Sequence, residues 1–349
     1  MYGNLELIKD IYNCIEDDLS RDIFINRINF SISNDTSFIK RIISTTQEGK
    51  DFLNKIYCDK KKVIFGAGSW GKEIVYTFRD IKFDYIIDNN EKICNQYING
   101  IKVIQFEEFL KLHADYQIII STRLYYNEIY NQLISNSINK ENILNAGSIL
   151  DLMCKKQYFD LPYLTKDDDE AFVDAGCFDG MTSIEFIKWC NYKFKKIWAF
   201  EPESRNIIKA ENNIRNAIIK NKVGGEFDII KRGLWDKKEQ LCFETDKNGA
   251  SKISETGAIM IDVDRLDEMI PVDQRVTFIK MDLEGAEINA IKGAQRIINK
   301  YHPKLAISVY HRMDDIVNIP ALINKYSNDY RFYFRHYSIG AAETVLYAI

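Results

Sequence analysis

The chain has 349 residues, of which 46% are hydrophobic and 28% charged, and its formal net charge at pH 7 is −4. This balance is typical of two globular domains and argues against an electrostatic surface for nucleic acid or a membrane. Nothing approaches ~20 uninterrupted apolar residues, and the seven scattered cysteines include no CxxC pair, so we expect no membrane span, disulfide framework or structural zinc site. The amino terminus lacks the pattern of a signal peptide, and we expect a cytoplasmic protein.

Residues 1–60 are predicted to be a helical segment. Apolar side chains recur at helical spacing from Leu5 to Ile15 and again from Phe38 to Ile56. The segment carries no recognisable chemistry. We interpret it as a helical cap or a dimerisation surface, and the second alternative would make the protein a homo-oligomer.

Residues 61–150 alternate strands with helices, and the predicted strands are 63–68, 83–88 and 117–122. Gly66, Gly68 and Gly71 form a GxGxxG loop after the first strand, and Asp88 ends the second. In such a loop the backbone approaches a phosphate and the acid meets ribose hydroxyls, but the same loop also occurs where nothing binds. We predict a Rossmann-like, nucleotide-binding-like domain and leave both alternatives open. Redox chemistry is disfavoured because the second half of a dinucleotide fold is missing.

The stretch 151–170, with Pro162 and an acidic run, is predicted to be a linker. A second α/β domain then covers 165–349, and its last two apolar runs should pair antiparallel because no helix separates them. The fold class is therefore α/β, with two tandem Rossmann-like domains. The predicted strands of the second domain are 171–176, 196–202, 227–235, 277–285, 304–311, 330–338 and 343–349, with a hairpin turn at Asn248-Gly249.

A second glycine loop contains Asp174, Gly176 and Gly180. An acid precedes its first glycine, so the loop suits a cationic ligand with a free amino group, such as S-adenosylmethionine, better than a diphosphate. Glu201 ends the next strand, where a carboxylate can accept hydrogen bonds from two ribose hydroxyls. Asp282 ends a third strand, and open α/β sheets bind ligands across these carboxyl ends.

Two histidines, His311 and His336, end strands that should reach the same edge of the sheet. An imidazole near neutrality can accept the proton of an attacking hydroxyl. We expect His311 to be the base before His336, with Asp282 orienting the donor or the acceptor. A structural role for each histidine stays open as the alternative.

The remaining polar residues near these strand ends receive simpler interpretations. Lys280 is expected to partner one of the acids, and Glu287 to be a helix N-terminal acid favoured by the helix dipole. No metal is required, although Asp282, Glu284 and His311 could hold Mg²⁺ if they converge.

The ordered motifs of residues 165–349 resemble the FkbM family of methyltransferases. They are VDAGCFDGMTS, AFEPE, GLWD, FIKMDLEGAEINAIKGA, HPKLAISVYH and the terminal RHYS…ETVLYA. The resemblance implies a class I methyltransferase fold with a terminal antiparallel hairpin, S-adenosylmethionine as the donor, and usually O-methylation of a sugar or similar polar acceptor. By motif it assigns donor binding to Asp174, Gly176, Gly180, Glu201 and Asp282, with Gly233, Leu234 and Trp235 near the adenine.

One residue departs from the family pattern. Ser308 stands where many relatives carry an acid, which removes an acceptor contact or metal ligand otherwise expected there.

We therefore predict an S-adenosylmethionine-dependent methyltransferase that acts on a hydroxyl of a sugar or glycan precursor, such as a nucleotide-linked sugar. One alternative is N-methylation of an amino-acid or amino-sugar substituent of a glycan. Another is a nucleotide-sugar-binding or assembly protein with an inactive methyltransferase domain. An inactive domain should have lost the donor acids, and they are present.

Overall fold

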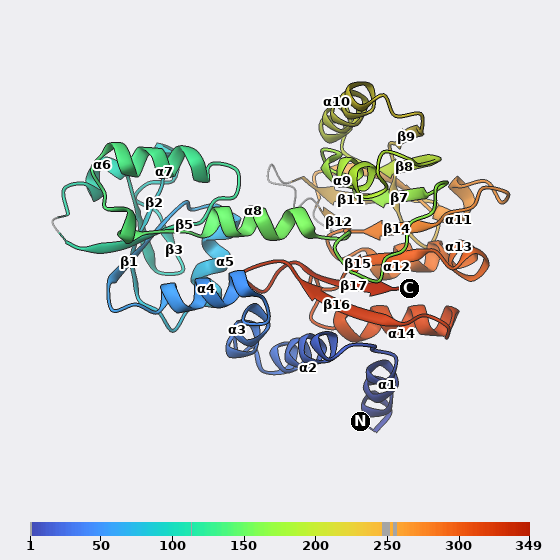
Figure 1. Cartoon of the computed structure of the whole chain (residues 1–349), viewed down its shortest axis with the longest axis horizontal. Coiled ribbons are helices and arrows are strands. Elements are labelled where there is room, and N and C mark those ends of the chain that lie inside the picture. The colour runs from blue at the N-terminus through green and yellow to red at the C-terminus, as the bar shows by residue number, and fades with distance from the viewer. Residues whose placement is uncertain (1, 113, 246–251, 254–256) are drawn as a thin grey trace. The chain divides into compact units, whose positions relative to one another are not determined.

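The computed structural model describes residues 2–112, 114–245, 252–253 and 257–349, and Figure 1 shows their helices and strands. The chain forms two compact units. The seven-stranded unit comprises Met1–Phe24, Gln157–Arg335 and Glu343–Ile349, and the six-stranded unit comprises Ile25–Lys156 and His336–Ala342. This division differs from the predicted segments 1–60, 61–150 and 165–349, because the helical segment is shared between the units. Within the described residues, no helix has the length and apolarity needed to cross a membrane.

The six-stranded unit has the strand order β3-β4-β2-β1-β5-β6. Every pair is parallel except β3 with β4, so the predicted parallel sheet is confirmed. Parallel strands are buried on both faces, which explains their nearly continuous apolar sequence. The strands are β1 (Lys61–Phe65), β2 (Phe83–Ile87), β3 (Tyr97–Ile98), β4 (Ile101–Ile104), β5 (Tyr116–Ile120) and β6 (Ile143–Asn145). The helices are α2 (Asp18–Ser33) from Ile25 onward, α3 (Ser37–Ile43), α4 (Gln47–Ile56), α5 (Ser69–Thr77), α6 (Phe106–Phe109), α7 (Tyr126–Ser135) and α8 (Ala146–Lys156), with 3₁₀ turns η1 (Glu91–Ile93) and η2 (Lys140–Asn142).

The seven-stranded unit has the strand order β16-β17-β15-β14-β7-β8-β9, which runs up the picture from β16 to β9 in Figure 1. The five strands from β15 to β9 are parallel, and β17 is antiparallel to β15. The strands are β7 (Ala171–Ala175), β8 (Lys196–Phe200), β9 (Glu226–Ile230), β14 (Phe278–Met281), β15 (Lys304–Ser308), β16 (Phe332–His336) and β17 (Thr344–Ala348). The helices are α1 (Tyr2–Asn13), α9 (Met181–Trp189), α10 (Ser204–Asn221), α11 (Leu266–Met269), α12 (Glu287–Gly293), α13 (Gln295–Tyr301) and α14 (Asp315–Tyr326).

The predicted closing hairpin is confirmed. β16 and β17 are neighbours in the sheet, and the backbones of Arg331 and Ile349 exchange N–H···O bonds of 2.9 and 3.1 Å. This mutual exchange is the signature of an antiparallel pair. The hairpin therefore lies on one side of the parallel strands. Because β7, β8, β14 and β15 are parallel, their carboxyl ends lie along one edge of the sheet.

Four short strands between β9 and β14 in the chain form a second sheet, with the order β10-β13-β11-β12. The predicted strand 227–235 is divided, because its last residues leave β9 and pair with β13 instead. β11 and β12 pair antiparallel as a hairpin requires, but the turn predicted at Asn248-Gly249 lies outside the described residues. The strands are β10 (Gly233–Leu234), β11 (Glu239–Glu244), β12 (Lys252–Ile253) and β13 (Ile259–Asp264).

The predicted linker 151–170 contains the boundary between the two units, which falls after Lys156, but it is not an exposed connection. α8 extends to Lys156, and Tyr158, Leu161 and Leu164 are 5, 3 and 8% exposed. Phe159 packs against the core ring of Phe278, with ring centroids 5.6 Å apart. Pro162 and the acidic run gave this stretch the composition of a linker, but its aromatic and leucine side chains bury apolar area against the sheet.

The residues that follow α1 pair with the edge strand of the seven-stranded sheet. Glu16 N–H donates to the Phe332 carbonyl and Phe332 N–H donates to the Cys14 carbonyl, at 3.1 and 2.9 Å. The Arg335 guanidinium pairs with Asp17 at 2.7 Å. An exposed strand edge invites pairing with other chains, so this part of the segment acts as a cap on β16.

Candidate functional site

A buried ion pair lies beneath the second glycine loop. Asp174 in β7 and Lys280 in β14 are register partners, and their Oδ1 and Nζ atoms are 3.2 Å apart. The two residues are 0 and 2% exposed, and Ser183 Oγ donates to the other Asp174 oxygen at 2.7 Å. The expectation that Lys280 partners an acid is confirmed. Asp174 itself lies below the loop surface, with its carboxylate occupied by protein groups.

Gly176 makes the sharp turn at the end of β7. Its φ is +78°, and a Cβ on this residue would lie 2.1 Å from the Asp282 carbonyl oxygen. Only glycine allows both the left-handed conformation and this approach. Lys280 Nζ donates to the Gly176 carbonyl at 2.8 Å, which fixes the turn from below. Gly180 follows in the same loop, directly before α9.

Glu201 ends β8 beside this turn. Its carboxylate accepts backbone N–H bonds from Phe178 at 3.1 Å and from Glu203 at 2.9 Å, and the residue is 6% exposed. Burial raises the pKa of Glu201 to about 7, although these hydrogen bonds oppose the rise. The loop and the strand-end acid are therefore in contact, as the strand order requires.

Gly233, Leu234 and Trp235 follow β9 at the same edge. Gly233 and Leu234 form β10 and are buried, while the Trp235 ring packs on the apolar cluster of the four-stranded sheet. The backbone N–H of Trp235 donates to the Asp264 carbonyl at 3.0 Å.

A second polar cluster surrounds Asp282, directly after β14. Tyr158 OH donates to Asp282 Oδ2 at 2.9 Å and lies 3.3 Å from Ser308 Oγ. Burial favours a raised pKa for Asp282, but the charges on Lys280 and His311 and the bonds from these hydroxyls hold the pKa below its usual value. Sequence reasoning missed Tyr158 because it lies in the predicted linker, and only its aromatic neighbours hinted at burial.

His311 follows β15 and faces three carboxylates. Its Nε2 lies 3.4 Å from Asp282 Oδ1 and 3.5 Å from Glu284 Oε2, and its Nδ1 lies 2.9 Å from Glu287 Oε1. Glu287 begins α12 as expected and accepts the Leu283 N–H at 2.7 Å, but it also holds the imidazole, which the sequence did not indicate. Asp282 and Glu284 thus each approach the imidazole, but within the described residues the group whose ligand atoms all lie within 4.8 Å of one another is Asp282, Glu287 and His311.

The electrostatics of His311 differ from the expected near-neutral imidazole. Burial lowers its pKa, but the hydrogen bond to Glu287 and the charges of Glu287, Asp282 and Glu284 outweigh burial and raise the pKa to about 10. At neutral pH the ring is an imidazolium. It can act as a proton acceptor only after its own proton has been displaced.

His336 occupies a different environment. It ends β16, and β17 separates that strand from β15 in the sheet. Burial, followed by the charge of Arg27, lowers the pKa of His336 to about 3, so the ring is neutral. A base with so low a pKa takes up protons weakly near neutrality. The position of His311 beside Asp282 also favours it over His336.

In the six-stranded unit, the first glycine loop is closed by its own acid. Asp88 accepts N–H bonds from Ala67 and Asn90, both at 2.8 Å. A Cβ on Gly71 would lie 2.0 Å from the Gly66 carbonyl oxygen, so this glycine has a packing reason. Packing therefore accounts for Gly71 without a ligand, whereas a Cβ on Gly68 would meet none of the described residues within 4 Å. Nucleotide binding by this unit stays a prediction.

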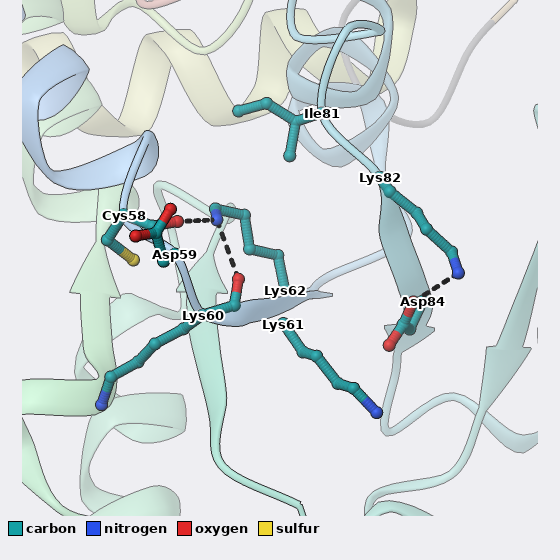
Figure 2. Close-up of a pocket in the computed structure, with 8 residues that line it drawn as sticks. All are labelled: Cys58, Asp59, Lys60, Lys61, Lys62, Ile81, Lys82 and Asp84. Atoms are coloured by element: carbon teal, nitrogen blue, oxygen red, sulfur yellow. Dashed lines mark hydrogen bonds and ion pairs between the residues drawn. The ribbon is translucent and has the colours of Figure 1, made fainter.

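A pocket of about 390 Å³ lies at the opposite, amino ends of β1 and β2 (Figure 2). Figure 2 shows Lys62 directed toward Cys58 and Lys82 toward Asp84. Lys62 Nζ donates to the Cys58 and Lys60 carbonyls at 2.5 and 2.9 Å, and the Lys82–Asp84 pair measures 3.6 Å. These lysine charges are satisfied within the protein, and the pocket is remote in its sheet from the glycine loop.

Two family models match parts of the chain. Residues 174–334 match the methyltransferase FkbM domain, which includes the second glycine loop, Glu201, Asp282 and His311. Residues 58–144 match the family described as C2185-like, N-terminal. The search of curated proteins gave no match.

Among solved structures, the methyltransferase FkbM from Methylobacillus flagellatus KT is similar, with 19% identity and a TM-score of 0.52 over 87% of this chain and 94% of that one. This likeness shows a shared fold. A putative rRNA methylase from Clostridium thermocellum, at 12% identity and a TM-score of 0.34, covers 58% of this chain and 94% of its own. A putative methyltransferase from Streptococcus mutans in complex with SAH, at 12% identity and a TM-score of 0.31, covers 52% and 90%.

The Asp174–Lys280 pair predicts a specific pattern of stability. Lys280→Met leaves a fully buried carboxylate without its cation, and we expect the free energy of unfolding to fall by about 3–5 kcal/mol. The double variant Asp174→Asn/Lys280→Met should be more stable than Lys280→Met alone, because no uncompensated charge remains. Urea denaturation of both variants measures the difference.

Lys196→Met is the matched control. Lys196 is also a strand lysine paired with acids, but Asp228 and Glu226 are 56 and 77% exposed, so we expect a loss of at most about 1 kcal/mol. Equal losses for Lys280→Met and Lys196→Met would contradict the importance assigned to the buried pair.

Proposed function

We propose that this chain, an S-adenosylmethionine-dependent methyltransferase by its FkbM domain at residues 174–334, methylates a hydroxyl of a sugar or glycan precursor, such as a nucleotide-linked sugar. The observation that carries the proposal is the contact between two polar clusters at one edge of the seven-stranded sheet. The glycine turn with Glu201 forms the donor side, and Asp282 with His311 forms the acceptor side.

The donor side fits S-adenosylmethionine. Glu201 Oε2 accepts one hydrogen bond, from Phe178, and a carboxylate oxygen can accept two, so a lone pair remains for a ribose hydroxyl. The Gly176 and Gly180 turn exposes backbone beside it, and we assign Gly233, Leu234 and Trp235 to the adenine. Asp174 is a positioning residue below the loop. It neutralises Lys280, and Lys280 Nζ donates a hydrogen bond to the Gly176 carbonyl.

The bound donor supplies a methyl group on a positively charged sulfur. The acceptor oxygen bonds to the methyl carbon, and the electron pair of the carbon–sulfur bond stays on sulfur. The hydroxyl proton is released. The protein's contribution is to hold the acceptor oxygen in line, which accounts for much of the rate in such displacements. Asp282 is the group best placed for this task. Its backbone carbonyl touches the Gly176 turn, and Tyr158 and Ser308 orient its carboxylate.

The polar character of the acceptor side supports a hydroxyl-rich acceptor. Four polar groups can each bond a sugar hydroxyl or fix a neighbour that does. They are the carboxylates of Asp282 and Glu284 and the buried hydroxyls of Tyr158 and Ser308. Such groups recognise polar substituents strongly because an acceptor that lacks them leaves buried polar atoms unpaired. This chemistry favours a carbohydrate over an apolar substrate.

Donor binding should depend on the ionisation of Glu201. The ribose hydroxyls bond best to a carboxylate, and with a pKa of about 7 the ionised fraction rises about tenfold from pH 6 to pH 8. We expect calorimetry with S-adenosylhomocysteine to show affinity rising by up to this factor. Glu201→Ala should weaken binding at pH 8 by about 1.5–3 kcal/mol, the range for hydrogen bonds to a charged group.

Glu201→Gln is the control for this pH dependence, since it keeps the shape and removes the charge. A flat profile in this variant is expected. A profile unchanged from wild type would move the titrating group away from Glu201, and absence of binding at millimolar ligand would contradict the donor site altogether.

The acceptor can be tested directly by mass spectrometry. Candidate sugar nucleotides incubated with S-adenosylmethionine and the full chain should gain the mass of one methylene, and fragmentation should place it on a sugar oxygen. Methylation of a nitrogen would select the amino-sugar alternative instead. If none of these sugar nucleotides is methylated, the carbohydrate proposal is contradicted.

His311→Ala should lower kcat by about 10²–10⁴ while S-adenosylhomocysteine affinity stays near wild type. The physical reason is that the imidazole touches the acceptor-side acids and none of the donor-side contacts. The matched control is His302→Ala, because His302 caps α13 and bonds Ser327. Near-normal turnover of His311→Ala would remove His311 from the reaction.

A further inference from the structure

The imidazole of His311, after β15, faces two carboxylates that follow β14. His311 Nε2 lies 3.4 Å from Asp282 Oδ1 and 3.5 Å from Glu284 Oε2. Ligands bound to one ion at about 2.1 Å stand ~3.0 Å apart in an octahedron and ~3.4 Å apart in a tetrahedron. The two separations from His311 Nε2 are close to the tetrahedral value. Within the described residues, the side chains whose ligand atoms all lie within 4.8 Å of one another are Asp282, Glu287 and His311, so the Glu284 carboxylate has to turn toward Asp282 to complete a shared ion.

Two of the facing atoms, one on His311 and one on Asp282, are buried and unsatisfied. The His311 side chain is 7% exposed, and within the described part of the chain its Nε2 makes no hydrogen bond. The same holds for Asp282 Oδ1. Buried polar atoms nearly always have a partner, because leaving one unpaired costs free energy. An ion placed among them would satisfy both atoms at once.

The other side of the imidazole is fixed by a carboxylate. Nδ1 of His311 lies 2.9 Å from Glu287 Oε1, and Glu287 is fully buried and also bonded to the Leu283 N–H. Metal-binding histidines characteristically donate their second N–H to such a carboxylate, which fixes the tautomer and aims the free nitrogen at the ion. The orientation of His311 toward Asp282 and Glu284 is the one that this arrangement produces.

The acids outnumber the cations here. Asp282, Glu284 and Glu287 contribute three carboxyl groups around the single imidazole of His311, whereas Lys280 is paired with Asp174. Close like charges repel unless a proton or a metal ion stands between them.

We propose that Asp282, Glu284 and His311 bind a divalent metal ion, with Glu287 orienting the imidazole from behind. One imidazole and two carboxylates suit Mn²⁺, Mg²⁺ and Zn²⁺. Three protein ligands leave coordination positions for water or the acceptor oxygen. The role of the ion rests on the methyl transfer proposed above: it holds the acceptor hydroxyl and withdraws electron density, so that the O–H proton leaves to solvent as the oxygen bonds to the methyl carbon.

Mn²⁺ is the probe for this site, since its free form can be counted by electron paramagnetic resonance. The full chain should bind one Mn²⁺, with Mg²⁺ and Zn²⁺ as competitors. His311→Ala and Glu284→Gln should each weaken binding at least tenfold. Glu287→Gln, which removes only the supporting carboxylate, should weaken binding about 10–100-fold.

Glu211→Gln is the matched control, because this α10 carboxylate is half exposed and pairs with Arg215. It should leave Mn²⁺ binding unchanged. S-adenosylhomocysteine binding is measured on every variant to show that the chain is folded, and the partly exposed Glu284 provides a test if Glu287→Gln does not fold.

Two outcomes overturn the metal site. One is a wild-type chain that binds S-adenosylhomocysteine but none of the three ions at millimolar concentration. The other is Mn²⁺ affinity unchanged in folded His311→Ala and Glu284→Gln. Either result leaves the methyltransferase function standing. Stoichiometric binding lost in these variants supports the site even if every carbohydrate acceptor fails, so the two proposals fail separately.

Discussion

The seven-stranded unit depends on one buried ion pair, Asp174 with Lys280. The two side chains face each other across adjacent strands, and neither could be charged alone at this depth without a cost of several kcal/mol. Lys280 Nζ also donates hydrogen bonds to the carbonyls of Ala175 and Gly176. The pair therefore fixes the glycine turn as well as the strand register. Because Asp282 is only two residues beyond Lys280, the same contact sets where the acceptor-side acids begin.

The acceptor side is assembled from segments far apart in the chain. Tyr158 comes from before β7, Asp282 from after β14 and His311 from after β15. Tyr158 has a φ of +73°, a conformation that costs a non-glycine residue about 1–3 kcal/mol. The neighbouring Phe159, packed into the core, supplies apolar burial that offsets this cost. Precise placement of the Tyr158 hydroxyl thus depends on packing that lies outside the site.

The sequence allowed prediction of the strands and of the acids at their ends, because both follow local rules. Hydrophobic periodicity locates β7, β8 and β14, and parallel order brings their carboxyl ends together. Long-range contacts could not be predicted in this way. The partner of Asp174 depends on strand register, and Tyr158 lay in a stretch of linker composition. Glu170, part of the acidic run in the predicted linker, is fully buried and paired with Lys304 at 2.6 Å.

The electrostatics of the two clusters separate their roles. Glu201 is desolvated without a cation, so its pKa is raised to about 7 and its charge responds to a ligand that donates hydrogen bonds. His311 is desolvated among three carboxylates, so its pKa is raised to about 10 and its Nε2 keeps a proton at neutral pH. That proton occupies the position that faces Asp282 and Glu284. A residue that the sequence presents as a base is therefore, in the folded protein, the positive member of an acid cluster.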